Sequence, residues 1–266
     1  MTLSTIRNNP AKQKKVKTKK QKAIAATCAV AFWLLVWHVV SLCVGSELVL
    51  VSPVKVVQTL FTVIFDPDFL KTVWYSAARI LGGFFAALTL GTVLGWVASR
   101  FWVVETLLRP ITAVIKATPV ASFIILALVW LESRHLPLFI AALMAFPVVY
   151  RNVLEGIRGT SRELLEMARV FRVPFSRRLR GVDLPQVLPY FRAAADTALG
   201  LSWKAGTAAE VIGLCSGTIG ERLYTAKVYF QTADLFAWTA VIVLLSVLFE
   251  GLFLRGVDAL TERWCA

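Results

Sequence analysis

Long runs of apolar residues alternate with short polar segments along the chain. Residues 23–44 contain no Asp, Glu, Lys or Arg, and at about 1.5 Å of rise per residue a helix of this length crosses the roughly 30 Å hydrocarbon core of a bilayer. Five later runs are also predominantly apolar. The pattern therefore predicts an all-α polytopic membrane protein with about six transmembrane helices, at residues 23–44, 75–98, 107–131, 138–154, 191–213 and 235–254.

Composition supports this interpretation. Of the 266 residues, 58% are hydrophobic, against roughly 45–50% in an ordinary soluble domain. The mean hydropathy is +0.69, yet the formal net charge is +13. Because the charged residues lie between the apolar runs, the two properties are compatible in a membrane protein.

The basic residues predict the orientation. If the N-terminus is cytoplasmic, the segments 1–22, 99–109, 151–192 and 255–266 face the cytoplasm, and they hold 21 of the 29 Lys and Arg residues. Cytoplasmic loops are enriched in Lys and Arg. We therefore expect both termini to be cytoplasmic.

The first 22 residues form a basic tail, and residues 23–266 form the predicted transmembrane domain. Such a tail fixes topology and contacts anionic lipid. Nucleic acid is not an expected partner because no aromatic residue is interleaved with the lysines, and a cleavable signal peptide is not expected because the first apolar run is too long. The basic residues concerned are Lys12, Lys14, Lys15, Lys17, Lys19, Lys20 and Lys22.

Motifs of energy-converting and catalytic proteins are absent from the sequence. There is no phosphate-binding GxxxxGK[ST] motif, no GxSxG or HExxH, and no Cys/His cluster. We therefore expect no catalysis, metal or cofactor, and an energy source on another polypeptide. A self-sufficient channel or secondary transporter stays open, although six spans without a repeat are few for the common transporter folds; a membrane-embedded enzyme also stays open.

The cytoplasmic segment of about residues 155–190 contains an amphipathic helix. Ser161 is placed to cap its start, with Glu163 in the first turn. Val173-Pro174 is expected to break the helix, because a residue before proline disfavours helical geometry. An amphipathic helix on a basic loop either lies on lipid or docks in a groove of a partner.

This segment resembles the EAA loop of ABC-importer permeases, EAA-x3-G-x9-I-x-LP. It reads Glu166-Met167-Ala168, three residues, Arg172, nine residues, and Val182-Asp183-Leu184-Pro185. The glutamate, the second alanine and the Leu-Pro pair match at the family's spacing. Arg172 departs from the family's glycine, which permits a tight turn between two helices.

Two flanking elements resemble the nitrate/sulfonate/taurine-type permeases. Leu50-Val51-Ser52-Pro53 precedes an amphipathic run, with Ser52 as the expected N-cap and Pro53 as the first helical residue. Residues 203–213 (WKAGTAAEVIG) resemble that subfamily's fifth span. The resemblance covers about residues 48–265.

The resemblance implies a type I ABC importer permease fold in the bacterial cytoplasmic (inner) membrane. It also implies a homodimer, a cytoplasmic ATPase subunit that binds the ATP, and an extracytoplasmic substrate-binding protein. The solute would be small and anionic, of the nitrate, sulfonate or taurine kind; a heterocycle such as a thiamine precursor is the alternative. The residues expected to couple the loop to the ATPase are Glu163, Leu164, Leu165, Glu166, Met167, Ala168, Phe171, Arg172, Leu184 and Pro185.

Polar residues inside the predicted spans are candidates for the translocation path, because ionisable groups are costly in a bilayer. Those of the fifth span recur every three or four residues, so we expect one stripe facing the path or the dimer axis. Lys204 either attracts an anion or pairs with Asp196 or Glu210. Lys116 either lines the path or snorkels to the cytoplasmic surface. The candidates are Lys116, Pro119, Asp196, Trp203, Lys204, Thr207 and Glu210.

Overall fold

A computed structural model describes residues 19–265, all of whose regular elements are helical. Most of the predicted basic tail, residues 1–18, lies outside the described residues. The described chain forms two compact units that divide after Pro53. The first contains α1 (Lys19–Val44); the second contains nearly all of the rest, namely α2 (Pro53–Ile64), α3 (Phe69–Arg100), α4 (Trp102–Ala117), α5 (Val120–Ala127), α6 (Leu136–Arg158), α7 (Arg162–Val170), α8 (Phe175–Arg178), α9 (Leu184–Ile212), α10 (Ile219–Val228) and α11 (Thr232–Cys265).

The predicted all-α membrane architecture is confirmed. Four helical segments are long and apolar enough to span a bilayer: Thr27–Val44 of α1, α3, Ser133–Arg158 around α6, and Thr232–Ala259 of α11. Helices α4 and α5 form a fifth only if the pair, bent by 105°, counts as one span. Helix α9, which contains the predicted fifth span, is 29 residues long but is not apolar enough to be counted, so the total of six spans stays a prediction.

Side chains on the outside of α11 fit a lipid environment. The segment Thr232–Ala259 has the highest mean hydropathy of the four, yet only 17% of its most apolar 18-residue stretch is buried within the protein. Large apolar residues exposed on a helix need a cover, which a bilayer supplies. They include Val243, Leu244, Val247, Leu248 and Leu252.

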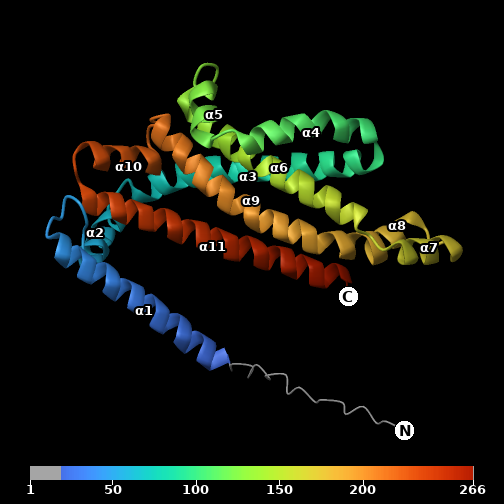
Figure 1. Cartoon of the computed structure of the whole chain (residues 1–266), viewed down its shortest axis with the longest axis horizontal. Helices are drawn as coiled ribbons and strands as arrows, with labels where there is room; N and C mark the ends of the chain where they lie inside the picture. The colour runs from blue at the N-terminus through green and yellow to red at the C-terminus, as the bar shows by residue number, and fades with distance from the viewer. Residues whose placement is uncertain (1–18, 266) are drawn as a thin grey trace, which may run out of the picture. The chain divides into compact units, whose positions relative to one another are not determined.

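The core of the second unit lies where α3, α6, α9 and α11 pack together (Figure 1). Phe84 of α3 and Trp203 of α9 are almost completely buried there, and the rings of Phe84 and Phe253 meet edge to face at 5.2 Å. Helices α3 and α6 approach closely because glycines of α3 face α6. A Cβ at Gly91 would lie 2.8 Å from the Val149 Cβ, and one at Gly95 would lie 3.0 Å from the Tyr150 carbonyl oxygen.

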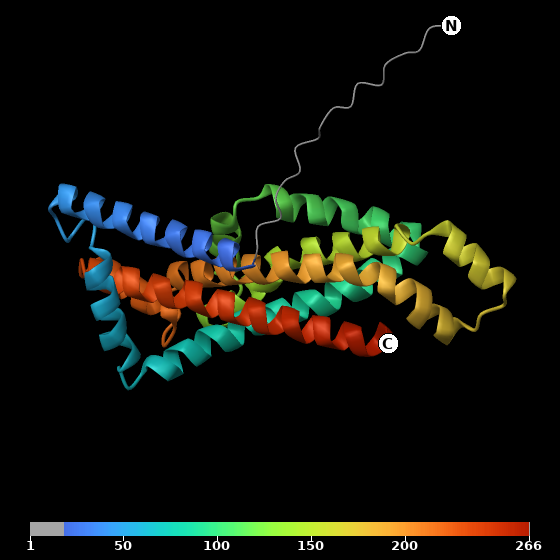
Figure 2. The same ribbon diagram turned by 90° about the horizontal axis from the view of Figure 1, so that it is seen from below.

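The loops gather at two ends of this helical unit. Helices α7 and α8 form a hairpin at one end, between α6 and α9, while α10 lies at the other (Figures 1 and 2). The last turns of α11 lie beside the start of α9, since Arg192 Nε is 2.6 Å from Asp258 Oδ1. The start of α4 lies there too, because Glu105 pairs with Arg158 at the end of α6. Parts of three segments predicted to be cytoplasmic, 99–109, 151–192 and 255–266, therefore share one end.

Candidate functional site

The start of α7 is fixed as the sequence predicts. The Leu164 amide donates to Ser161 Oγ at 3.4 Å, so Ser161 is the N-cap. The Ser161 amide in turn donates to Gln186 Oε1 of α9 at 2.8 Å. The serine thus caps α7 and also connects it to the helix that follows the hairpin.

The end of α7 has the geometry that the family's glycine would favour, although an arginine occupies the position. Arg172 adopts φ +49°, in the left-handed region. The Val173 amide donates to the Ala168 carbonyl at 2.9 Å, and the Arg172 amide donates to the Arg169 carbonyl at 3.1 Å. This is a Schellman motif. The helix therefore ends at Val170, before the predicted break at Val173-Pro174, and Pro174 begins α8 as its N-cap.

Arg172→Gly is expected to remove about 1 kcal/mol of left-handed strain, because glycine adopts positive φ without a Cβ clash. Arg169→Gly makes the same chemical change inside α7 and is expected to destabilise that helix by about 1 kcal/mol. Protease cleavage within residues 155–190 of the purified protein should slow in the first variant and accelerate in the second. Equal cleavage of the two variants would contradict the assignment of strain to Arg172.

One face of the α7–α8 hairpin is apolar and exposed. Ala168 is buried and Leu165 half-buried against the protein. Val170 and Phe171, by contrast, are 77% and 75% exposed, and Glu166 is also exposed. An exposed apolar cluster beside charged groups is typical of a docking surface. We call this set the hairpin face: Leu164, Glu166, Met167, Val170, Phe171 and Phe175.

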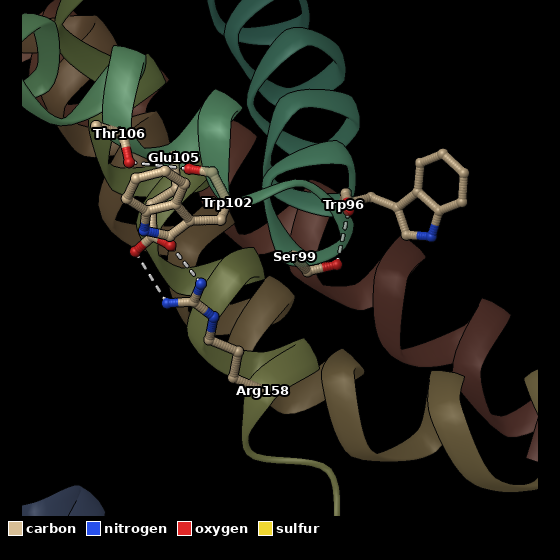
Figure 3. Close-up of polar contacts among 6 residues, drawn as sticks. All are labelled: Trp96, Ser99, Trp102, Glu105, Thr106 and Arg158. Atoms are coloured by element: carbon tan, nitrogen blue, oxygen red, sulfur yellow. Dashed lines mark hydrogen bonds and ion pairs between the residues drawn. The ribbon is translucent and has the colours of Figure 1, made fainter.

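The hairpin begins beside an ion pair that the sequence did not predict. Arg158, the last residue of α6, donates through Nη1 to Glu105 Oε1 at 2.9 Å and through Nη2 to Glu105 Oε2 (Figure 3). Glu105 lies in the first turn of α4, so each charge also complements the dipole of its own helix. The bidentate pair joins the first turn of α4 to the end of α6, three residues before the α7 cap.

A cavity of about 310 Å³ lies between α4, α5, α6 and α9. It brings together two of the predicted path residues, Lys116 from the last turn of α4 and Lys204 from α9. Its other lining residues are mostly apolar, such as Val120 and Met144. Within residues 19–265, no ion pair of either lysine is present, so the predicted pairing of Lys204 with Asp196 or Glu210 does not form.

The other path candidates do not lie on one surface with Lys204. Trp203 and Glu210 are buried in the protein, and Thr207 is half-buried. Asp196 lines a different cavity, of about 460 Å³, with Arg192 and Asp258. Pro119 is the N-cap of α5 at the bend. The predicted stripe therefore divides between the protein interior and two cavities.

Glu210 connects three helices. Its Oε2 accepts hydrogen bonds from Ser76 Oγ of α3 at 2.9 Å and from the Gly220 amide at 3.1 Å. Ser76 Oγ accepts from the Ile219 amide at 2.8 Å. These amides belong to the first two residues of α10, which lack partners within the helix. Among the described side chains, no group of three His, Cys, Asp or Glu residues is arranged to hold a metal ion.

Comparison with known proteins identifies relatives of the chain. Residues 87–264 match the family model described as "binding-protein-dependent transport system inner membrane component". A putative aliphatic sulfonates transport permease protein of Bacillus subtilis is 28% identical, over 87% of this chain and 84% of that protein. The taurine transport system permease protein of Escherichia coli is 27% identical, over 86% and 84%. The nitrate import permease protein of Synechocystis is 27% identical, over 72% of each.

Proposed function

Because the chain belongs to the family of binding-protein-dependent transport system inner membrane components, we propose that it is the transmembrane subunit of an ATP-driven importer and that its α7–α8 hairpin docks on a cytoplasmic ATPase. The family consists of ABC transporter permeases.

The assembly we propose has two copies of this chain in the bacterial inner membrane, each with both termini in the cytoplasm. Each copy contacts an ATPase subunit that binds the ATP, and an extracytoplasmic substrate-binding protein delivers the solute. The chain itself performs no catalysis and carries no cofactor. Its motif content supports this division of roles, since the sequence has no phosphate-binding loop.

The hairpin face is the observation that carries the proposal. Its apolar side chains are exposed, at the end of the helical unit where parts of three predicted cytoplasmic segments meet. Glu166 is exposed among them, where it can meet a basic group in a groove of the partner. The Ser161 cap and the Schellman turn make the helix a rigid element, and a rigid docked helix transmits a displacement that a flexible loop would absorb.

The solute we propose is a small anion. The relatives named above are permeases for sulfonates, taurine and nitrate, and these solutes each carry a negatively charged oxygen group. The ammonium groups of Lys116 and Lys204 at one cavity supply the complementary charge. No feature of the described residues favours the heterocycle alternative.

Co-purification of the tagged chain with a co-expressed ATPase, which we expect a neighbouring reading frame to encode, tests the coupling. Glu166→Arg is expected to reduce capture of the ATPase at least tenfold, because a reversed charge in a desolvated interface costs several kcal/mol. Val170→Asp should have a similar effect, since it places a charge within the apolar contact. Both variants should insert into the membrane as the wild type does.

Glu132→Arg is the matched control, because Glu132 is equally an exposed glutamate but lies outside the hairpin. It should leave capture unchanged. Equal capture by Glu166→Arg and wild type would move the docking surface away from this face. Failure of the wild type to capture any ATPase would favour a self-sufficient channel or secondary transporter.

A further inference from the structure

The cavity between α4, α5, α6 and α9 has two positive charges and no negative one. Of its lining residues, only Lys116 and Lys204 are ionisable. No hydrogen bond or ion pair of either ammonium group occurs in the part of the chain that the structure describes. An unpaired charge is costly in a membrane-embedded protein and marks a functional site by default. Two such charges at one mostly apolar cavity call for an anionic occupant.

The break between α4 and α5 places the start of α5 beside this cavity. The two helices meet at 105°, and Thr118 and Val120, on either side of Pro119, line the cavity. Pro119 provides no side-chain cap for α5, while the Ser122 and Phe123 amides bond to its carbonyl. The amides of Val120 and Ala121, the first two of α5, have no hydrogen bond within residues 19–265. Interrupted membrane helices often present such N-termini to anionic groups.

The size of the cavity limits the ligand. At about 310 Å³ it lies near the lower end of the range for small-molecule pockets, roughly 300–1,000 Å³. It suits an oxyanion, or a sulfonate with a short carbon chain that contacts side chains such as Met144. Besides the two lysines, its only polar lining side chain is Thr118, so it lacks the many hydrogen-bond partners that a disaccharide or a nucleotide needs.

We propose that the cavity at the α4–α5 break binds the oxyanion group of a small solute between the ammonium groups of Lys116 and Lys204. This anion site deepens the proposed function. It rests on that function because it takes the bound anion to be the transported solute. Each lysine contributes a charge-assisted hydrogen bond. The amide of Val120, which lines the cavity at the start of α5, adds a directional component that distinguishes an oxyanion from a simple halide.

Protection of the lysines from an amine-reactive reagent tests the site without knowledge of the natural solute. The full-length chain is placed in nanodiscs of zwitterionic lipid, and the labelling rate of each lysine is read by mass spectrometry. Sodium methanesulfonate and sodium nitrate are the probes. A sodium salt of a bulky disaccharide acid at the same ionic strength is the reference. Lys227 is the internal control, because it is exposed on α10 and lies outside the cavity.

Saturating methanesulfonate or nitrate is expected to slow labelling of Lys116 and Lys204 by about tenfold relative to the reference salt. A change of this size corresponds to at least one charge-assisted hydrogen bond between the anion and each ammonium group. Labelling of Lys227 should not change. In Lys204→Gln, protection of Lys116 should require about tenfold more anion, whereas Lys204→Arg should retain protection. The wild-type measurement stands alone if a variant fails to fold.

Equal labelling in the probe and reference salts, or equal protection of Lys227, would overturn the proposal. Protection in nanodiscs of anionic lipid without any added probe would assign the site to a lipid phosphate instead, which also overturns it. The labelling experiment and the ATPase-capture experiment test different proposals, so their failures can be distinguished. Capture without protection would refute only the anion site, and protection without capture would leave an anion site in a transporter of another class.

Discussion

Gly83→Ala is expected to prevent stable packing of α3 against α6. A Cβ at this position would lie 2.3 Å from the Leu138 carbonyl oxygen, 2.8 Å from the Ala141 Cβ and 3.0 Å from the Ala142 amide nitrogen. Two of these three atoms belong to the backbone of α6, so no rotamer change relieves the contact. Overpacking of a well-packed core costs about 1–3 kcal/mol and sometimes more, and we expect the upper end here because a whole helix must shift.

Gly82→Ala is the matched control on the same helix. The nearest atom to its added Cβ would be Leu138 Cδ1 at 3.4 Å, the end of a flexible side chain. Alanine also has the higher helix propensity, by up to about 1 kcal/mol, so this variant should be neutral or slightly stabilised. Size-exclusion chromatography of detergent-extracted protein measures both. Equal yields of monodisperse protein from the two variants would contradict the packing described for Gly83.

Local sequence signals predicted the starts of two helices correctly. Helix α2 begins at Pro53, and Ser161 caps α7, because capping depends on a few neighbouring residues. Helix α9 begins several residues before the predicted fifth span. The predicted span begins at residue 191, whereas α9 begins at Leu184 with Pro185 in its first turn. Proline needs no hydrogen-bonded amide there, so it starts the helix instead of preceding it.

Contacts between distant residues could not be predicted from the sequence. Pro119 was predicted only as a candidate for the translocation path, and the 105° bend beside it depends on how α5 packs against α6 and α9. The Glu105–Arg158 pair joins residues 53 positions apart, and the Ser76–Glu210 bond joins residues 134 positions apart. Helical periodicity placed Glu210 near Lys204 on one stripe, yet only the packing of α3 and α10 decides that Glu210 faces the protein interior.

At Arg172 the family motif predicted the local turn correctly, although an arginine replaces the family's glycine. The family's glycine predicted a tight turn at this position, and the arginine left that geometry in question. The structure retains the turn with φ +49° and with both hydrogen bonds of the Schellman motif. The bonds of Val173 and Arg172 to the end of α7 thus outweigh a strain of about 1 kcal/mol.

Glu210→Ala is expected to detach α10 from α3 and α9. Glu210 is completely buried, and its loss leaves the Ser76 hydroxyl and the Gly220 amide without their acceptor. Each unsatisfied buried group costs about 1–3 kcal/mol, and the emptied side-chain volume adds a further cost. We expect a total loss of about 3 kcal/mol or more, against about 1 kcal/mol for Glu221→Ala, whose carboxylate accepts only from the Gly217 amide among the described residues.

Glu210→Gln removes the carboxylate charge of Glu210 but keeps an oxygen that accepts its hydrogen bonds. Its amide oxygen can accept from both Ser76 and Gly220, so the thermal stability of the purified chain should fall far less than in Glu210→Ala. Amide hydrogen exchange of α10 should likewise increase strongly only in the alanine variant, because only there do the first amides of the helix lose their acceptor. An equal loss in both variants would mean that the charge of Glu210, acting on the nearby Arg79, holds α10 in place, and that its role as a hydrogen-bond acceptor is secondary.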